Sequence, residues 1–421
     1  MENGLLAVKD KVVGVSTATF FLFQLYQLEF FLHISARFKF IGVFRPTLLL
    51  FAVITVLLIS QRGKIYERLT HPILKAYGVF LVIVFLTLPF VTYPGSVIKN
   101  NIPVFLKAIV FLYFVSLILD TDKRFKWSLL VFVCCQVFRV LEPLYLNLTQ
   151  GYWGDSTYID GEFANRLAGA PADVINPNEL GFVIATVIPF LHYYLLPRSW
   201  FYKLLYLGIL PLLLYALILT MSRGAFLALL VVAWIIFKES RHKVLLIAAA
   251  VVIVVSAFSV MNDTQKDRYL SLVSSESKQT KSKEGRVKGM ISEFTLGLAR
   301  PIFGHGLGTT AETKVQNGHN RQAAHNMYAE ILIEVGFVGM FFLIRFAKKI
   351  HFQLTFANER LKTAENFHKT TFKILRIIFW MFVVYSINYW GLTQYYWYNL
   401  AGLVVACAYL SNTVIPVRKF R

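Results

Sequence analysis

The sequence predicts an all-α, polytopic membrane protein, a single membrane domain over residues 1–421. Its 421 residues are 57% hydrophobic and 16% charged, with a mean hydropathy of +0.57. Soluble chains carry about 25% charged residues, so an ordinary soluble enzyme is excluded. The 16% aromatic content excludes a disordered chain. Apolar runs of the roughly 20 residues that cross a bilayer recur along the sequence.

These runs predict about twelve transmembrane helices. The first is the least regular, because Gln24, Gln27 and Glu29 interrupt it, and Glu29 could be a packing detail or a functional group. The expected spans lie near residues 12–34, 41–60, 73–92, 102–120, 127–146, 180–197, 202–220, 223–237, 243–260, 326–347, 373–390 and 395–413.

The distribution of positive charge predicts the orientation. Lys and Arg total 43 against 23 Asp and Glu, a net charge of +20. Cytoplasmic loops are enriched in Lys and Arg, and every second loop is basic when the N-terminus is cytoplasmic. Both termini are therefore expected in the cytoplasm. The basic inner positions include Arg62, Lys64, Arg68, Lys123, Arg124, Lys126, Arg198, Lys203, Lys238, Arg241, Lys243, Lys348, Lys349, Arg418 and Lys419.

Two segments, 147–179 and 261–325, are too polar to span the membrane, and both fall on the outer side in this topology. Loops of this length are uncommon unless they are functional. The longer one is strongly basic. Long translocated loops escape the positive-inside rule, so its charge indicates an anionic partner at the outer face.

Arg223 follows Ser222 in a tight hairpin between two apolar runs. If Ser222 is the N-cap of the next helix, Arg223 lies in the first turn, where a cation opposes the helix dipole unless an anion is bound. A phosphate would suit this position. Alternatively, Arg223 is an interfacial anchor whose charge reaches the lipid headgroups.

Arg286 begins an amphipathic stretch of the long outer loop, in which Val287, Met290, Ile291 and Phe294 recur at helical spacing. Such a helix could lie on the membrane surface with its basic residues exposed. On its own, Arg286 is more often a solvated charge than a ligand.

His325 lies where the long outer loop meets the tenth expected span. A histidine beside arginines stays neutral at working pH and can accept a proton, which suits a general base. A structural histidine, or a metal site formed with His305 and His319, are the alternatives. The spacing of the three histidines matches no ligand pattern.

Arg166 and the turn Asn176–Pro177–Asn178 occupy the first outer segment. Asn-Pro-Asn is typical of a turn that caps a helix. Arg166 could be a further contact to an anion or a surface charge.

Taken in order, these motifs resemble the O-antigen ligase and polymerase superfamily of bacterial membrane glycosyltransferases. The resemblance covers residues 150 to 340. It rests on four groups, which are Arg166 with Asn176–Pro177–Asn178, Thr220–Met221–Ser222–Arg223–Gly224, Gly285–Arg286 with Arg300–Pro301–Ile302–Phe303–Gly304–His305–Gly306, and His325–Asn326 with Glu334–Val335–Gly336–Phe337–Val338–Gly339.

The resemblance implies a GT-C-like fold in the bacterial inner membrane and an active site that faces the periplasm. The donor would be a glycan on undecaprenyl diphosphate, and transfer would invert the anomeric carbon without metal, nucleotide sugar or other cofactor. Arg223 and Arg286 would bind the diphosphate, and His325 would deprotonate the acceptor hydroxyl. Further substrate contacts are expected from Arg166, Asn178, Ser222, Arg300 and Asn326.

Among the activities in this superfamily, ligation of O-antigen onto lipid A-core is the first expectation. A polymerase that uses a second lipid-linked repeat as acceptor is the alternative. A transporter of a lipid-linked anionic glycan would also explain the apolar composition, but the paired broken helices of inverted-repeat carriers are not evident. The expected partners are these glycan lipids and membrane lipids, not nucleic acid.

Overall fold

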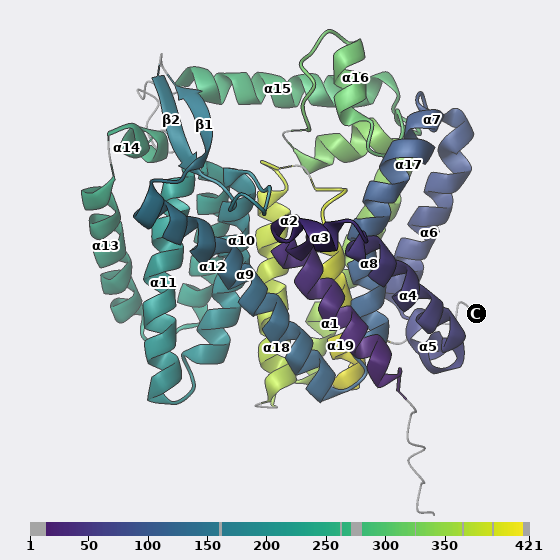
Figure 1. Ribbon diagram of the computed structural model, residues 1–421, viewed down its shortest axis with the longest axis horizontal. Coiled ribbons are helices and arrows are strands. Elements are labelled where there is room, and N and C mark those ends of the chain that lie inside the picture. The colour runs from purple at the N-terminus through teal and green to yellow at the C-terminus, as the bar shows by residue number, and fades with distance from the viewer. Residues whose placement is uncertain are drawn as a thin grey trace, which may run out of the picture.

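The computed structural model describes residues 14–159, 162–261, 263–270, 280–324, 326–363, 366–389 and 391–415. It is a bundle of helices with one small sheet (Figure 1). In chain order the elements are α1 (Thr17–Leu32), α2 (Ile34–Arg37), α3 (Lys39–Gly42), α4 (Pro46–Ser60), α5 (Arg62–Leu69), α6 (Pro72–Thr87), η1 (Leu88–Phe90), α7 (Pro94–Ser96), η2 (Val97–Asn101), α8 (Ile102–Ile118), α9 (Asp122–Gln150), β1 (Gly154–Ile159), β2 (Glu162–Leu167), α10 (Pro177–Leu195), α11 (Trp200–Thr220), α12 (Arg223–Glu239), α13 (Lys243–Val260), α14 (Asp263–Leu270), α15 (Thr280–Ala299), α16 (Thr310–Gln316), α17 (Met327–Arg360), α18 (Phe367–Tyr385) and α19 (Tyr396–Leu410).

Each of the twelve expected spans contains a helix, but the helices differ in their ability to cross a bilayer. Within the described ranges, five segments are long and apolar enough, namely Pro72–Phe90, Pro94–Ile118, Asp122–Gln150, Trp200–Thr220 and Met327–Arg360. A sixth is possible if α4 and α5, bent by 92°, form one span. Helices such as α1 and α19, with 16 and 15 residues, are shorter than the roughly 20 that a bilayer requires. The chain is thus a multi-pass membrane protein, and hydropathy alone did not anticipate these short helices.

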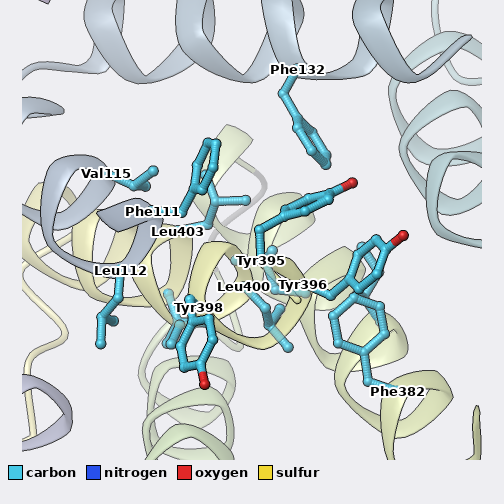
Figure 2. Packing of buried hydrophobic residues seen from close by; sticks show 14 of the residues in the cluster. Phe111, Leu112, Val115, Phe132, Phe382, Tyr395, Tyr396, Tyr398, Leu400 and Leu403 are labelled. Atoms are coloured by element: carbon cyan, nitrogen blue, oxygen red, sulfur yellow. The ribbon is translucent and has the colours of Figure 1, made fainter. Parts of the chain in front are cut away.

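The core of the bundle is aromatic and aliphatic, and it centres on α8 and α19 (Figure 2). The two helices pack closely because α19 has a glycine at the crossing. A Cβ on Gly402 would lie 2.8 Å from the Phe111 carbonyl oxygen and 2.8 Å from the Val115 Cβ. Tyr395 extends this core and packs against Phe111 and Phe31, with ring centroids 5.5 and 5.1 Å apart.

The two long segments lie at the same end of the bundle, at the top of Figure 1. There α15 runs across the helix ends from the side of β1 and β2 toward α16. The structure is mostly helical, as expected, and it adds one antiparallel pair, β1–β2, in which Gly154 pairs with Leu167 and Ile159 with Glu162. Its sequence signal was present, because the strands are separated by Asp160–Gly161, a dipeptide favoured in two-residue hairpin turns.

Helix α17 is interrupted at Gly336, which has φ 62° and ψ −169°. The loop after α15 supplies the hydrogen bonds that the break removes. The amides of Phe337 and Val338 donate to the carbonyls of Pro301 and Ile302, at 2.7 and 3.2 Å. In return, the carbonyls of Ile333 and Glu334 accept from the amides of His305 and Gly306, at 2.7 and 2.9 Å. Backbone groups inside a bilayer must be satisfied by protein, and here a loop performs that role.

Candidate active site

The α11–α12 turn has the geometry that its sequence predicted. Met221 adopts the left-handed region at φ 50°, and Ser222 is the N-cap of α12, its Oγ accepting from the Ala225 amide at 3.3 Å. Arg223 is therefore the first residue of the helix, and it is buried, with 7% of its surface exposed. An interfacial anchor would be exposed to lipid or water, so this burial argues against that alternative.

Arg166, on β2, holds the same turn from the opposite side. Its Nε donates to the Thr220 carbonyl oxygen at 2.9 Å, and its Nη2 donates to the Asn178 Oδ1 at 3.0 Å. The side chain is 5% exposed. Arg166 is thus not a surface charge but a buried guanidinium that joins the hairpin, the first turn of α10 and the α11–α12 turn.

Helix α10 approaches this turn very closely. Asn176 caps α10 as predicted, with its Oδ1 accepting from the amides of Asn178 and Glu179, both at 3.0 Å. One turn later, a Cβ on Gly181 would lie 2.6 Å from the Ala225 Cβ and 3.3 Å from the Ser222 Cβ. The N-terminal ends of α10 and α12 therefore meet, and their partial positive charges add at one place.

The C-terminal end of α18 connects this cluster to the start of α17. The Tyr385 hydroxyl donates to the Asn178 carbonyl oxygen at 2.9 Å, and the next residue, Ser386, accepts from the Met327 amide at 2.9 Å. Asn326 caps α17, accepting from the Tyr328 and Ala329 amides at 2.7 and 3.1 Å. Asn178 and Asn326, distant in sequence, are thereby linked through two consecutive residues.

For His325, the predicted base, and Arg286, the second predicted diphosphate ligand, the structure describes neighbouring residues or the helix but not the side chain. His325 lies outside the described residues, and both of its neighbours, Ala324 and Asn326, are buried. Arg286 lies on α15, whose helical conformation agrees with the predicted amphipathic stretch, and its side chain is outside the described part.

Other predicted groups have different partners. Arg300 is exposed and its Nη1 donates to the Phe90 carbonyl oxygen at 3.0 Å, which places it at η1. His305 is buried between the Thr92 Oγ1 at 3.0 Å and the Leu296 carbonyl oxygen at 3.2 Å. His319 instead contacts the Ser292 Oγ, at 3.3 Å. His305 and His319 thus have separate partners, which does not favour a shared metal site.

The segment that precedes His325 is fixed by a buried ion pair. Lys314, on α16, donates from its Nζ to the Glu293 Oε1 on α15 at 2.6 Å and to the Ala323 carbonyl oxygen at 3.0 Å. The lysine therefore connects α15, α16 and the residues that lead into α17. Part of the positive charge of the 261–325 segment is therefore structural.

Residues 208–344 match the family model described as O-antigen ligase. This stretch of the chain is similar to the O-antigen ligase family. No curated protein matches the chain. The matched region includes Arg223, Arg286, Arg300 and His325, and it ends within α17. Arg166 lies before it, so the contact between Arg166 and Thr220 joins a residue outside the matched region to one inside it.

The sequence analysis assigned no role to two buried carboxylates of α17, although Glu334 belongs to one of its motifs. Glu330, in the first turn of α17, accepts from the amides of Gly391 and Leu392 at 2.8 and 3.1 Å. Glu334 accepts from the Thr310 hydroxyl at 2.7 Å. The available signal was a carboxylate inside an apolar span, since intramembrane acids are rare and often functional.

The described part of the candidate site is thus cationic and screened from water. Arg166 and Arg223 are both buried at the end of α12, and helix N-termini are ready anion sites. A phosphate or diphosphate is the anion that suits Arg223, because a guanidinium group can offer paired N–H donors, while Arg166 adds positive charge and directs its own donors to Thr220 and Asn178. Such an arrangement stabilises negative charge on a leaving group.

Proposed function

We propose that this chain is the O-antigen ligase that transfers a glycan from undecaprenyl diphosphate to a lipid A-core sugar. The observation that carries the proposal is the pair Arg166 and Arg223, both buried at the N-terminal end of α12. Within a multi-pass membrane protein, this pair offers positive charge where a lipid-linked diphosphate could enter sideways from the bilayer.

In the proposed reaction, Arg223 and Arg286 bind the diphosphate, and His325 takes the proton from the acceptor hydroxyl. The acceptor oxygen then attacks the anomeric carbon, the bond from that carbon to the phosphate oxygen breaks, and the configuration inverts. The diphosphate leaves with its negative charge stabilised by the guanidinium groups. Proton transfer to a positioned base typically contributes 10²–10⁴-fold, so a base and an anion site together could supply much of the catalysis.

The remaining predicted substrate contacts have different roles in this proposal. Ser222, Asn178 and Asn326 are helix-cap or first-turn residues that surround the arginines, so we assign them to positioning the diphosphate and the base. Arg300 lies at η1, so we assign it to a more distant part of the donor.

We place the site at the periplasmic face of the bacterial inner membrane, with both termini in the cytoplasm. The positive-inside distribution supports this orientation. So does the gathering of both long segments at one end of the bundle, the end at which α10, α12 and α17 begin (Figure 1).

The test is a deletion strain complemented with variants and examined by lipopolysaccharide electrophoresis. For a ligase, we expect core without O-antigen while polymer accumulates on the carrier lipid. Core capped by a single repeat would identify the chain as the polymerase instead. Arg223→Ala and His325→Ala should fail to complement, while Arg198→Ala, an exposed arginine at the opposite end of α10, should complement fully. Full complementation by Arg223→Ala and His325→Ala would refute the mechanism.

A further inference from the structure

A cavity of about 540 Å³ lies beside the arginine cluster, on the other side of the first turn of α10. Its volume falls within the roughly 300–1,000 Å³ of small-molecule sites. Elements from distant parts of the chain converge on it. The lining residues include Phe30 and His33 at the end of α1, Arg139 on α9, Gly154 and Asp155 on β1, Asn176 and Glu179 at α10, and Gln394 and Tyr395 before α19.

The cavity and the arginine cluster share their walls. Asp155, which lines the cavity, pairs with Arg166 in the register of the hairpin. Asn176 and Glu179 line the cavity, whereas Asn178, between them, accepts a hydrogen bond from Arg166. A ligand in the cavity would therefore lie one strand and one helical turn from the proposed diphosphate site.

The charges of the cavity are unlike those of the neighbouring cluster. Its one lining arginine, Arg139, is already paired with Asp173, from Nε to Oδ2 at 2.6 Å and from Nη2 to Oδ1 at 2.9 Å. Two carboxylates, Asp155 and Glu179, also line it, and no lysine does among its described residues. A phosphate would meet like charge here, so the cavity does not extend the anion site.

The polar groups of the cavity suit hydroxyl-bearing ligands. The Asp155 carboxylate and the Gln394 amide oxygen can accept from hydroxyl groups, whereas the Asn176 Oδ1 is already bonded to two amides of α10. The buried Nδ1 of His33 has no hydrogen-bond partner among the described residues, although it lies 3.5 Å from an Asp173 oxygen. Phe30 and Tyr395 add aromatic surface. This mixture of aromatic rings and hydroxyl acceptors is what an uncharged sugar requires.

We propose that this cavity binds uncharged sugar residues of a glycan substrate. The inference rests on the proposed transferase function and adds a second subsite to it, so that the phosphate and sugar parts of the substrates bind to separate, oppositely charged walls. Both the donor glycan and the acceptor core carry such sugars, and the experiment distinguishes them.

The experiment measures binding to the full chain in lipid nanodiscs by saturation-transfer NMR. The probes are the delipidated polysaccharide of the producing strain, its core oligosaccharide released from lipid A, and inorganic pyrophosphate. Val174 lines the cavity with 94% of its side chain exposed, so a larger residue there should obstruct the cavity without disturbing the core. Val174→Trp should lower the affinity for one of the two glycans about tenfold and change the affinity for pyrophosphate less than about twofold. Val174→Thr should change neither.

A second pair of variants controls for surface effects. Gln394→Ala should weaken binding of the same glycan. Gln316→Ala, which changes an exposed residue on α16, should leave that binding unchanged. Loss of polysaccharide binding would assign the cavity to the donor, and loss of core oligosaccharide binding would assign it to the acceptor. Unchanged binding of both in Val174→Trp and Gln394→Ala would overturn the inference. Arg223→Ala should weaken the binding of pyrophosphate and leave the binding of the glycan unchanged. If Arg223→Ala kept both pyrophosphate binding and glycan transfer, the proposed function would fail independently of the cavity.

Discussion

Arg166 and Thr220, 54 residues apart in the chain, are joined by a hydrogen bond of 2.9 Å from the Arg166 Nε to the Thr220 carbonyl oxygen. The bond fixes the turn that presents Arg223. It also couples the β1–β2 hairpin to the region that matches the O-antigen ligase family, so the 147–179 segment takes part in the candidate site rather than covering it.

Arg166→Lys should preserve the charge but lose the fork of donors that reaches both Thr220 and Asn178. Hydrogen bonds from charged groups contribute about 1.5–3 kcal/mol each, so we expect glycan transfer to fall by roughly tenfold or more. Transfer in isolated membranes is the measurement, with Arg198→Lys as the exposed control. Unchanged transfer in Arg166→Lys would show that the turn does not depend on this contact.

Gly181→Ala tests the close approach of α10 to the α11–α12 turn. The added Cβ would lie 2.6 Å from the Ala225 Cβ, so the helices must separate. Overpacking of this kind costs about 1–3 kcal/mol, and we expect a lower unfolding temperature in detergent together with reduced transfer. Gly208→Ala, on α11, is the matched control, because nothing lies within 4 Å of its added Cβ. Equal unfolding temperatures for the two variants would contradict the packing argument.

Asn326→Ala removes the cap of α17 next to the proposed base. Losing an N-cap side chain costs about 0.5–2 kcal/mol, and the amides of Tyr328 and Ala329 lose their acceptor. We expect kcat for transfer to fall more than donor affinity, because the base is displaced while the diphosphate site at α12 is intact. Asn326→Asp keeps the acceptor and should recover most of the rate. If Asp and Ala behave alike, capping is not the role of this residue.

The stability of the glycine loop around His305 should depend on pH. Burial, reinforced by Arg300, lowers the pKa of His305 below its ordinary 6.5, although the Leu296 carbonyl raises it. The folded state therefore binds fewer protons than the unfolded state. The contribution of His305 to stability is present above pH 6.5 and is lost as the pH falls through the folded value. Unfolding temperatures measured across this range should fall on acidification in the parent protein, and less in His305→Gln.

Loss of one partner of the Lys314–Glu293 ion pair should destabilise the protein more than loss of both partners. Lys314→Met leaves the buried Glu293 without its cation, and breaking a buried pair costs about 3–5 kcal/mol, whereas apolar replacement of both partners is often neutral. Limited proteolysis should cleave the 301–324 segment faster in Lys314→Met, and the double variant with Glu293→Leu should recover part of the protection. Additive effects would indicate that the two side chains do not interact.

The sequence predicted the local features of this site well and the distant ones poorly. Ser222 and Asn176 could be identified as caps, because capping depends on a few neighbouring residues. The contact from Arg166 to Thr220 could not, because it requires the register of a hairpin that hydropathy did not reveal.

The same limit applies to α17. Gly336 belongs to a motif that the sequence drew attention to, yet a hydropathy run gives no sign that the backbone breaks there. The break depends on the loop from Pro301 to Gly306, which supplies the missing hydrogen-bond partners. Neither segment predicts the arrangement alone.

That break has a consequence for biogenesis. Until the 301–306 loop is in place, the backbone groups of Ile333, Glu334, Phe337 and Val338 lack the partners they have in the folded protein. Each such group costs several kcal/mol in hydrocarbon. The first half of α17 cannot enter the lipid at low cost before the preceding loop is in place. Folding of this loop and insertion of the helix are therefore coupled in the assembly of the protein.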